Sequence, residues 1–337
     1  MQPLRVGILG AARIAPDSIV TPAHLTGTRL VAIASRDRAR AHAFAREHGV
    51  ERVLDSYADV IADPEVEAIY NPLANGLHAP WNLRAIAAGK HVLSEKPFAS
   101  NAEEAIEVRD AGKRAGVVVA EGFHYRYHPV TKRLHELLAN GDLGELRHVE
   151  VRMINPACPP DDPRWSLALA GGALMDLGCY SLHAHRVLAP WAGGEPVLVS
   201  ARGGERAGLH GVDEWLEAEL AFQSGATGLA YCNMAGPAQE LTYRIVGSRG
   251  EAIIPNFILP HIDDRLVVKT DAGESVEHLG TRSSYTSQLE AFTAAVRTGA
   301  PMPTDSDDAV ATMRLIDATY RAAGFEPRPR WTATAEG

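Results

Sequence analysis

Two short motifs carry residue types that can transfer a proton and stabilise a developing negative charge. Ser94-Glu95-Lys96-Pro97 places a lysine at the end of an apolar segment, and Asp176 and Tyr180 stand at positions i and i+4, which puts them on one face of a helix. A tyrosine beside a lysine suits acid–base chemistry, because the ammonium lowers the phenol pKa and either group can hydrogen-bond a reacting oxygen. Lys96, Tyr180 and Asp176 are therefore the candidate catalytic residues.

The division of roles among these residues stays open at the level of sequence. Either Tyr180 or Lys96 can carry the proton, and Asp176 can orient Lys96 or a substrate hydroxyl. Pro97 ends strand pairing and can fix a turn, including one with a cis peptide bond. The alternatives are a surface lysine and a buried Asp–Tyr pair that only holds its helix to a neighbour. His183, on the same helix face, suits a structural role or a pocket wall.

A degenerate glycine turn follows the first apolar run of the chain. Gly10-Ala11-Ala12-Arg13-Ile14-Ala15 stands where the GxGxxG motif of a dinucleotide site would be. Gly10 is the first glycine of the motif, which makes the tight turn. Alanine at the other positions still lets the backbone approach a pyrophosphate. The N–H groups that open the next helix are expected to face that anion. A plain strand-to-helix turn is the alternative.

The end of the second apolar run, Leu30 to Ser35, indicates which dinucleotide would bind. NAD sites usually carry an acidic residue here, whereas this chain has Ser35-Arg36, with Arg40 one helical turn further on. Serine can donate to a phosphate and a guanidinium can grip one with paired hydrogen bonds, so the pattern favours the 2′-phosphate of NADP over NAD. Asp37 argues weakly for NAD, unless it caps the following helix.

Strand-like and helical segments alternate in the first third of the chain, which predicts a parallel, doubly wound sheet. The strand-like runs are 4–10, 30–35, 67–71, 91–94 and 117–120, and the helical runs are 39–48, 78–88 and 101–115. From about Arg147 strands dominate, at 148–154, 197–202, 215–222, 228–234 and 243–246, before a late helix at 305–323. We expect an α/β Rossmann domain at 1–122. At 123–337 we expect an α+β domain with a large, open-faced, predominantly antiparallel sheet, whose last helices pack back on the first domain.

Composition excludes several classes of function. The 337 residues suffice for two domains, and a net charge of −9 argues against a nucleic-acid partner. No apolar run reaches membrane-spanning length, and the start of the chain does not read as a secretory signal. Three sparse cysteines, Cys158, Cys179 and Cys232, favour a reducing, cytoplasmic location, and none has metal-ligand spacing, so we expect no metal site.

Taken together, the motifs resemble the Gfo/Idh/MocA oxidoreductase family over nearly the whole chain. The resemblance is carried by the Gly10 turn, Ala34 to Asp37, Gly89 to Pro97, Tyr125-Arg126-Tyr127-His128-Pro129, Gly171 to Tyr180 and Tyr285 to Phe292. Many members have histidine where this chain has Tyr180. Tyrosine there is similar to the branch with dimeric dihydrodiol dehydrogenase, glucose-fructose oxidoreductase and the NADP-dependent xylose dehydrogenases, which mostly uses NADP.

The resemblance implies that a nicotinamide lies between the two domains and that the open sheet is an oligomer interface, in a dimer or a tetramer. With the residues chosen above from the pattern alone, the expected cofactor-binding set is Leu9, Gly10, Ala11, Ala12, Arg13, Ile14, Ser35, Arg36, Arg40, Asn71, Leu73, Ala74, Asn75, His78, Glu95, Lys96, Arg164, Trp165 and Tyr285.

The leading hypothesis is an NADP-dependent dehydrogenase or reductase that transfers a hydride between nicotinamide C4 and a carbinol or carbonyl carbon of a sugar, polyol or vicinal diol. A second hypothesis is a ketoreductase on a nucleotide-linked sugar in a natural-product pathway. It would need basic residues at the pocket mouth, for which Arg126, Arg152 and Arg202 are available. A third is a non-catalytic nucleotide-sensing regulator, against which the retention of the three candidate catalytic residues speaks.

Overall fold

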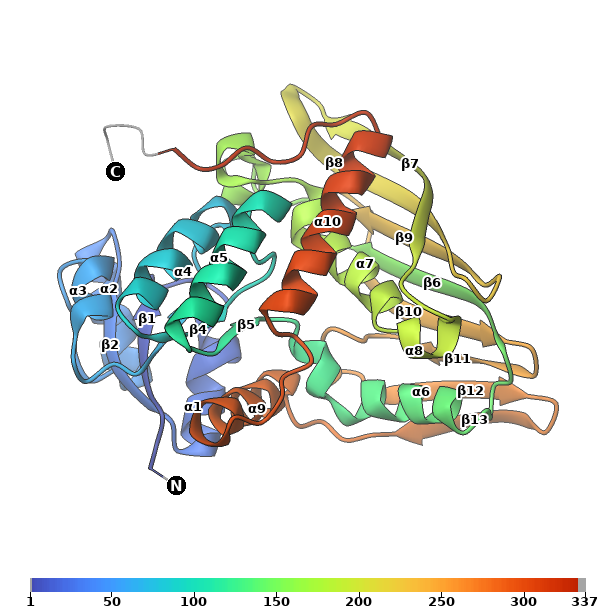
Figure 1. Ribbon diagram of the computed structural model, residues 1–337, viewed down its shortest axis with the longest axis horizontal. Helices are drawn as coiled ribbons and strands as arrows, with labels where there is room; N and C mark the ends of the chain where they lie inside the picture. The colour runs from blue at the N-terminus through green and yellow to red at the C-terminus, as the bar shows by residue number, and fades with distance from the viewer. Residues whose placement is uncertain (1, 333–337) are drawn as a thin grey trace. The chain divides into compact units, whose positions relative to one another are not determined.

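The structure is a computed structural model that describes residues 2–332. It forms two compact units, each built on its own sheet (Figure 1). Of the described residues, the first unit contains 2–124, 285–313 and 330–332, and the second contains 125–284 and 314–329.

The first unit is built on five parallel strands in the order β2-β1-β3-β4-β5. They are β1 (Arg5–Leu9), β2 (Arg29–Ala34), β3 (Ala68–Asn71), β4 (His91–Ser94) and β5 (Val119–Glu121). Their residues are buried almost throughout, as a sheet covered on both faces requires. The parallel, doubly wound sheet predicted from the alternating pattern is confirmed.

Local sequence signals set the helix ends of this unit. Asn101 caps the longest of the early helices by accepting from the Glu104 N–H at 3.1 Å, and Gly116 ends it in a left-handed conformation. That helix, α5, lies beside α4 over one face of the sheet (Figure 1). The helices are α1 (Thr21–Thr26), α2 (Arg38–His48), α3 (Tyr57–Ala62), α4 (His78–Ala87), α5 (Ala102–Ala115), α9 (Ser284–Thr298) and α10 (Ser306–Ala322), the last passing from the first unit to the second at Met313.

An ion pair ties the returning helix α9 to the sheet of the first unit. Arg297, near the end of α9, donates to both carboxylate oxygens of Glu67 at 3.0 and 2.8 Å, and Glu67 also accepts from the Arg5 backbone N–H at 3.1 Å. These hydrogen bonds lower the pKa of Glu67 to about 2, with that to Arg297 the largest cause. Because the folded pKa lies below the ordinary value, the pair stabilises the fold above about pH 5 and loses that effect as the pH falls toward 2.

We therefore predict that Glu67→Gln lowers the free energy of unfolding by about 1–3 kcal/mol at pH 7 and by less at pH 3.5. Urea unfolding of the variant and the parent protein at the two pH values measures the difference. Glu47→Gln, which removes a carboxylate 74% exposed on α2, is the control and leaves stability nearly unchanged. A difference that grew on acidification would contradict the assignment.

The second unit is built on an eight-stranded sheet in the order β13-β12-β11-β10-β6-β9-β8-β7. Only β6 and β9 run parallel, and the other neighbours are antiparallel, which confirms the predominantly antiparallel sheet. The strands are β6 (Leu146–Ile154), β7 (Val197–Arg206), β8 (Leu209–Ala221), β9 (Thr227–Asn233), β10 (Glu240–Gly247), β11 (Gly250–Ile254), β12 (Arg265–Thr270) and β13 (Gly273–His278). The helices α6 (Pro129–Ala139), α7 (Cys179–Arg186) and α8 (Ala189–Ala192) lie over one face (Figure 1).

The other face of this sheet carries charged side chains that are paired across the strands. Residues alternate between buried and half-exposed along β6, β9 and β10. On the half-exposed side Arg152 donates to Glu240 at 2.8 Å and lies 4.9 Å over the ring of Tyr231, and Arg244 pairs with Glu251. The expected open face therefore exists, and it combines ion pairs with apolar side chains such as Val276, which is 48% exposed and lies in register with Val267.

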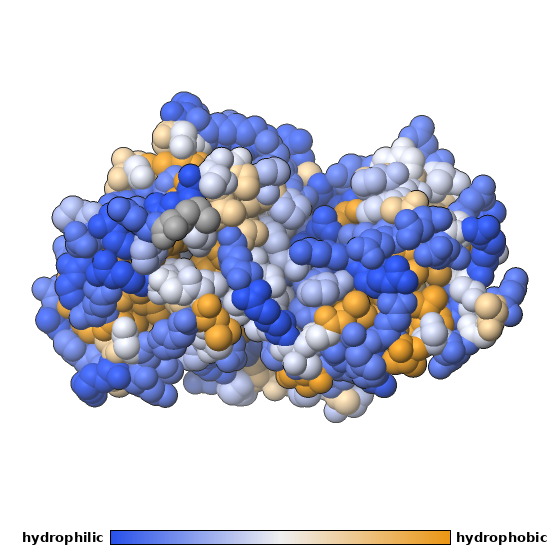
Figure 2. Space-filling model, turned by 90° about the horizontal axis from the view of Figure 1, so that it is seen from below, coloured by the Kyte–Doolittle hydropathy of each residue, from blue (hydrophilic) through white to orange (hydrophobic). Residues whose placement is uncertain are grey.

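Several helices and strands of the structure were not predicted from the sequence. β11, β12 and β13 are short, and five of the six residues of β13 are exposed, so an alternation of apolar residues is missing there. The helices α3, α6, α8 and α9 were likewise not predicted. Within residues 2–332 no helix has the length and apolar character needed to cross a membrane. The face in Figure 2 is largely hydrophilic, with hydrophobic residues in separate patches.

Candidate active site

The turn after β1 confirms the role expected for Gly10. Its φ of +90° lies in the region that favours glycine, and its N–H donates to the Ala34 carbonyl at 2.7 Å. A Cβ at this position would stand 3.1 Å from the Leu73 side chain, so the turn leaves little room there. Gly10 therefore closes the end of β1 against the loop after β3.

The helix after this turn differs from the expectation. It opens with a π-helical stretch, Pro16–Val20, in which the Thr21 N–H reaches back to the Pro16 carbonyl. Pro16 has no N–H, and the amides of Ala15, Asp17 and Ser18 already donate to the carbonyls of Ala12 and Ile14. The amides of these three residues are therefore engaged within the chain, whereas they were expected to face an anion.

The end of β2 presents two exposed arginines beside a capped helix. Asp37 accepts from the Arg40 N–H at 3.1 Å and is the N-cap of α2, so its side chain serves the helix, which was one of the two alternatives. Arg36 and Arg40 are exposed, and their guanidinium groups oppose the rise in the Tyr57 pKa that burial causes. A cationic surface therefore stands beside the Gly10 turn.

Tyr57 belongs to this surface, although sequence reasoning missed it. Its hydroxyl would lie 3.6 Å from a Cβ at Gly10, and its ring packs edge-on against Trp81 with centroids 5.0 Å apart. Arg84 lies 4.4 Å over Trp81 in turn. Tyr57 follows no motif and opens a short helix, so only the packing of α3 against β1 and β2 reveals it.

Two polar side chains brace the loop after β3, residues 71–78, against the turn at Lys96. Asn71, at the end of β3, donates to Asn82 at 2.8 Å and accepts from the Leu73 N–H. His78 is buried with Nδ1 2.6 Å from the Pro97 carbonyl and Nε2 2.8 Å from the Leu73 carbonyl. Burial lowers the His78 pKa to about 4, so the neutral ring at pH 7 donates to only one of them. Asn71 and His78 thus hold the 71–78 loop against the Lys96-Pro97 turn.

The peptide bond between Lys96 and Pro97 is cis, which confirms the turn expected from the sequence. Glu95, one residue earlier, accepts a hydrogen bond from the Tyr70 hydroxyl at 2.8 Å, and that hydroxyl lies 2.5 Å from Ser18. Burial raises the pKa of Glu95, while the Tyr70 hydrogen bond and the charge of Lys96 oppose the rise. A buried polar chain therefore runs from the helix after the Gly10 turn to the residue next to Lys96.

Tyr285, at the start of α9, packs beside the same group of residues in the first unit. Its ring stacks on His124 with centroids 3.7 Å apart, and its pKa is raised by burial first and by the charge of Glu95 second. Ser18, Tyr70 and His124 were not anticipated. Tyr70 is the only one of them with a sequence signal, since it stands in β3 one residue before Asn71.

In the second unit, a helical segment carries Asp176 and Tyr180. Its first turn, Leu174–Gly178, is π-helical, with the Cys179 N–H donating to the Leu174 carbonyl, and α7 continues it. The expectation that glycines let this segment start against another backbone is confirmed. A Cβ on Gly171 would collide with the Arg164 carbonyl, which accepts from the Gly172 N–H at 2.9 Å.

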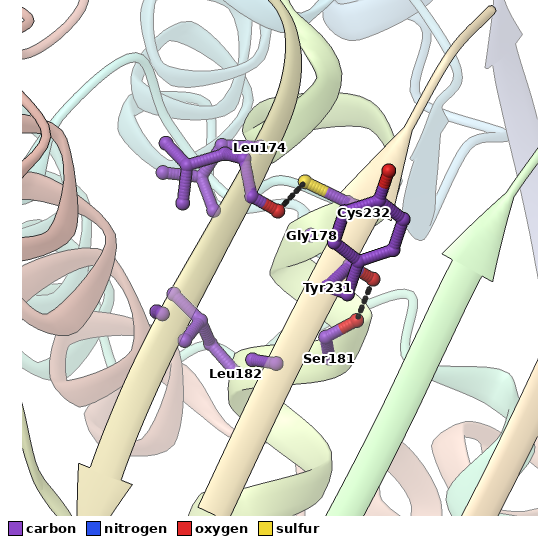
Figure 3. Close-up of a pocket in the computed structure, with 9 residues that line it drawn as sticks. Leu174, Gly178, Ser181, Leu182, Tyr231 and Cys232 are labelled. Atoms are coloured by element: carbon purple, nitrogen blue, oxygen red, sulfur yellow. Dashed lines mark hydrogen bonds between the residues drawn. The ribbon is translucent and has the colours of Figure 1, made fainter. Parts of the chain in front are cut away.

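The inner side of the segment is packed against β8 and β9 (Figure 3). Ser181 donates to the Tyr231 carbonyl at 3.3 Å, and the Cys232 thiol donates to the Leu216 carbonyl at 3.5 Å. The space between these side chains has no room for a water molecule. A Cβ on Gly178 would press on Leu174 and Cys232, so this close fit requires a glycine at that position.

Asp176 and Tyr180 each have defined neighbours within this unit. Arg164 grips Asp162 through two hydrogen bonds of 2.9 and 3.0 Å and reaches Asp176 at 3.6 Å. Tyr180 packs against Tyr125 with ring centroids 6.1 Å apart, and the Tyr125 hydroxyl lies 2.7 Å from His183 Nδ1. His183 therefore serves as a buttress, as expected, while the role of Asp162 as the partner of Arg164 was missed.

The predicted residues thus gather in two groups. Those at the ends of β1 to β4, with Lys96 and Tyr285, belong to the first unit, and Arg164 and Trp165, with Asp176 and Tyr180, belong to the second. The joining of the two groups at one nicotinamide is part of the proposal below. Among residues 2–332 no cluster of histidine, cysteine, aspartate and glutamate has an arrangement that could hold a metal ion.

A parallel sheet with a tight glycine turn, a cationic second-strand end and a lysine on its carboxyl edge defines a dinucleotide-dependent oxidoreductase. Comparison with known families agrees: residues 4–123 match the oxidoreductase family with the NAD-binding Rossmann fold, and residues 131–253 match the GFO/IDH/MocA C-terminal domain. The chain belongs to the Gfo/Idh/MocA oxidoreductase family.

Relatives within the family include sugar and diol enzymes. The chain is 37% identical to a D-xylose 1-dehydrogenase (NADP(+)) of Haloferax volcanii, over 94% of this chain and 96% of that one. It is 33% identical to trans-1,2-dihydrobenzene-1,2-diol dehydrogenase of Sus scrofa, over 74% of each chain. Among solved structures, a 3-ketoreductase from Actinomadura kijaniata in complex with NADP and TDP-benzene superposes with a TM-score of 0.88 at 27% identity, covering 95% of this chain and 98% of that one.

We predict that Asp37→Ala lowers the stability of the protein by about 1 kcal/mol, because α2 loses its N-cap, whereas Asp37→Ser keeps it. Thermal unfolding of the two variants measures the difference. Neither variant changes the preference between NAD and NADP, since the carboxylate serves the helix. A serine variant as unstable as the alanine variant would contradict the capping role.

Proposed function

We propose that the protein is an NADP-dependent oxidoreductase that acts on a carbinol or carbonyl carbon of a sugar, polyol or vicinal diol. The observation that carries the proposal is the braced Lys96-Pro97 turn at the carboxyl end of β4, where ligands bind in such sheets. When bound, the cofactor supplies or accepts the hydride at nicotinamide C4. The relatives named above, which include an NADP-dependent xylose dehydrogenase and a diol dehydrogenase, support the choice of cofactor and substrate class.

The chain's own residues would handle the oxygen on the reacting carbon. Lys96 and Tyr180 hydrogen-bond that oxygen, and one of them exchanges its proton while the other stabilises the developing charge. Asp176, whose partner within its unit is Arg164, orients a substrate hydroxyl or Lys96. The proposal requires that Lys96 from the first unit meet Asp176 and Tyr180 from the second at the bound nicotinamide.

The residues at the end of β2 fit NADP better than NAD. Ser35 and Arg36 follow β2 directly, and Arg36 and Arg40 are both exposed. The Asp37 carboxylate caps α2 and is therefore not available to a ribose. A 2′-phosphate there would meet a serine hydroxyl and guanidinium groups with Tyr57 behind them.

The ketoreductase alternative keeps the support of the fold likeness to the 3-ketoreductase. The arginines considered for its diphosphate are engaged elsewhere, however. Arg152 and Arg202 are paired with Glu240 and Glu217 on the outward face of the sheet, and Arg126 hydrogen-bonds His135. The non-catalytic regulator stays the weakest alternative, because the chain retains all three candidate catalytic residues.

The family resemblance also leads us to expect a dimer or tetramer through the outward face of the eight-stranded sheet, where half-exposed Tyr231 and Trp215 lie among paired charges. A cytoplasmic location stays a prediction from the three sparse cysteines, which form no disulfide within the described residues.

We predict that Tyr180→Phe lowers turnover by about 10²-fold or more and leaves NADPH binding nearly intact. A panel of aldoses, polyols and diols with NADP, followed at the absorbance of the reduced nicotinamide, first finds the substrate, and the variant is then compared on it. Tyr231→Phe, on the outward sheet face, is the matched control and keeps the parent rate. An unchanged rate for Tyr180→Phe would remove this tyrosine from the mechanism, and no turnover on any of the panel would count against the substrate class.

We also predict that Arg36→Ala weakens the binding of NADPH much more than that of NADH, by about tenfold, as the loss of one charged hydrogen bond would. Cofactor fluorescence titration gives both dissociation constants. The control is Arg46→Ala, which removes an exposed arginine within α2 and alters neither dissociation constant. Equal losses for the two cofactors would mean that Arg36 does not touch the 2′-phosphate.

A further inference from the structure

One arginine near the C-terminus is buried at the start of the segment that carries Asp176 and Tyr180. Arg328 is 1% exposed and donates from Nε to the Gly171 carbonyl at 2.7 Å and from Nη1 to the Gly211 carbonyl at 2.8 Å. Its remaining nitrogen, Nη2, donates to Asp213 Oδ1, and the guanidinium lies 4.1 Å over the ring of Tyr320. Each nitrogen of a buried charge is thus paired, as burial requires.

The carboxylate partner of Arg328 holds the same segment from the other side. Asp213, in β8, is fully buried, and its Oδ2 accepts from the Leu174 N–H at 2.7 Å. Leu174 is the first residue of the π-helical turn, so Asp213 acts as the cap of a segment that has no side-chain cap of its own. The Tyr320 hydroxyl donates to Asp213 Oδ1 at 3.0 Å and keeps the carboxylate in place.

The two contacts enclose the glycine turn between them. Gly172 has a φ of +127°, and a Cβ there would collide with both Asp213 and Arg328. The Gly172 carbonyl accepts from the Asp176 N–H at 3.0 Å, which makes it the first link from the turn to a candidate catalytic residue. Displacement of the 171–174 backbone would therefore pass directly to Asp176, and through the helical segment to Tyr180.

We propose that Arg328 is a positioning residue for Asp176 and Tyr180, which it holds through Asp213 and the Gly171 carbonyl. The inference rests on the proposed function for the catalytic roles of those two residues. Apolar side chains of similar volume in this space would often give the protein the same stability as the buried ion pair does. The paired charge fixes where the segment begins, and a reaction that depends on the placement of Tyr180 gains from that.

The test compares Arg328→Met with Arg330→Met. Arg330, two residues further on, is 40% exposed and pairs with Glu107, so its replacement controls for the loss of an arginine from the same tail. For Arg328→Met we expect turnover to fall by about 10- to 100-fold, the usual cost of misplacing a reacting group. We also expect faster hydrogen exchange at the amides of residues 173–180, with an NADPH dissociation constant within about twofold of the parent value. Arg330→Met changes none of the three.

The outcomes separate this inference from the proposed function. Unchanged exchange at residues 173–180, or faster exchange with full turnover, would overturn the positioning role. Faster exchange and lost turnover, in a protein whose Tyr180→Phe variant keeps full activity, would refute the catalytic role of Tyr180 and leave the anchoring of the segment standing. Should Arg328→Met fail to fold, Arg328→Lys keeps the charge opposite Asp213 with fewer donors, and a graded loss of turnover at unchanged NADPH affinity supports the inference, while full activity opposes it.

Discussion

In each unit an arginine from the last fifth of the chain closes on a carboxylate that lies far earlier in the sequence. Arg297 and Glu67 are separated by 230 positions, and Arg328 and Asp213 by 115. The Arg328–Asp213 pair is buried, and a buried charge tolerates few partners, so this pair fixes where its segment lies more than it adds to the total stability. The Arg297 and Glu67 side chains are 19% and 24% exposed, and their pair contributes to stability as well. Through these contacts α9 is tied to the first sheet, and Arg328 is tied to the segment of the second unit that carries Asp176.

The functional groups of the first unit are collected by the direction of its strands. Gly10, Ser35 and Lys96 follow three different strands of one parallel sheet and Asn71 ends a fourth, so their loops emerge at a single edge. Hydrogen bonds then set each loop: Asp37 caps α2, and Asn71 with His78 braces the turn at Lys96. In the second unit Asp176 is positioned by the π-helical turn that packs on β8 and β9, and by its ion pair with Arg164.

Residues whose signal is local were the ones that sequence reasoning placed correctly. Gly10 has the positive φ that its position in the motif requires, Asp37 is a cap, and the Lys96-Pro97 bond is cis. Tyr57, Tyr70 and Asp162 were missed, since each matters through a neighbour from another element: Arg36, Glu95 and Arg164 in turn. The amides after Gly10 were misjudged because Pro16 and a π-helical stretch replace the regular helix that the motif usually opens.

By itself, the sequence determined the fold class, the order of the strands of the first sheet along the chain, the helix caps and the identity of the candidate catalytic residues, since hydrophobic period, glycine and proline act over a few residues. Tertiary structure alone decided which distant groups meet. Nothing near Arg328 in the chain indicates that its guanidinium reaches Gly171, Gly211 and Asp213, because that choice follows from the packing of α10 and β8 around one buried charge. Local conformational preferences determine the helices and strands, and the need to pair buried polar and charged groups determines which of them contact one another.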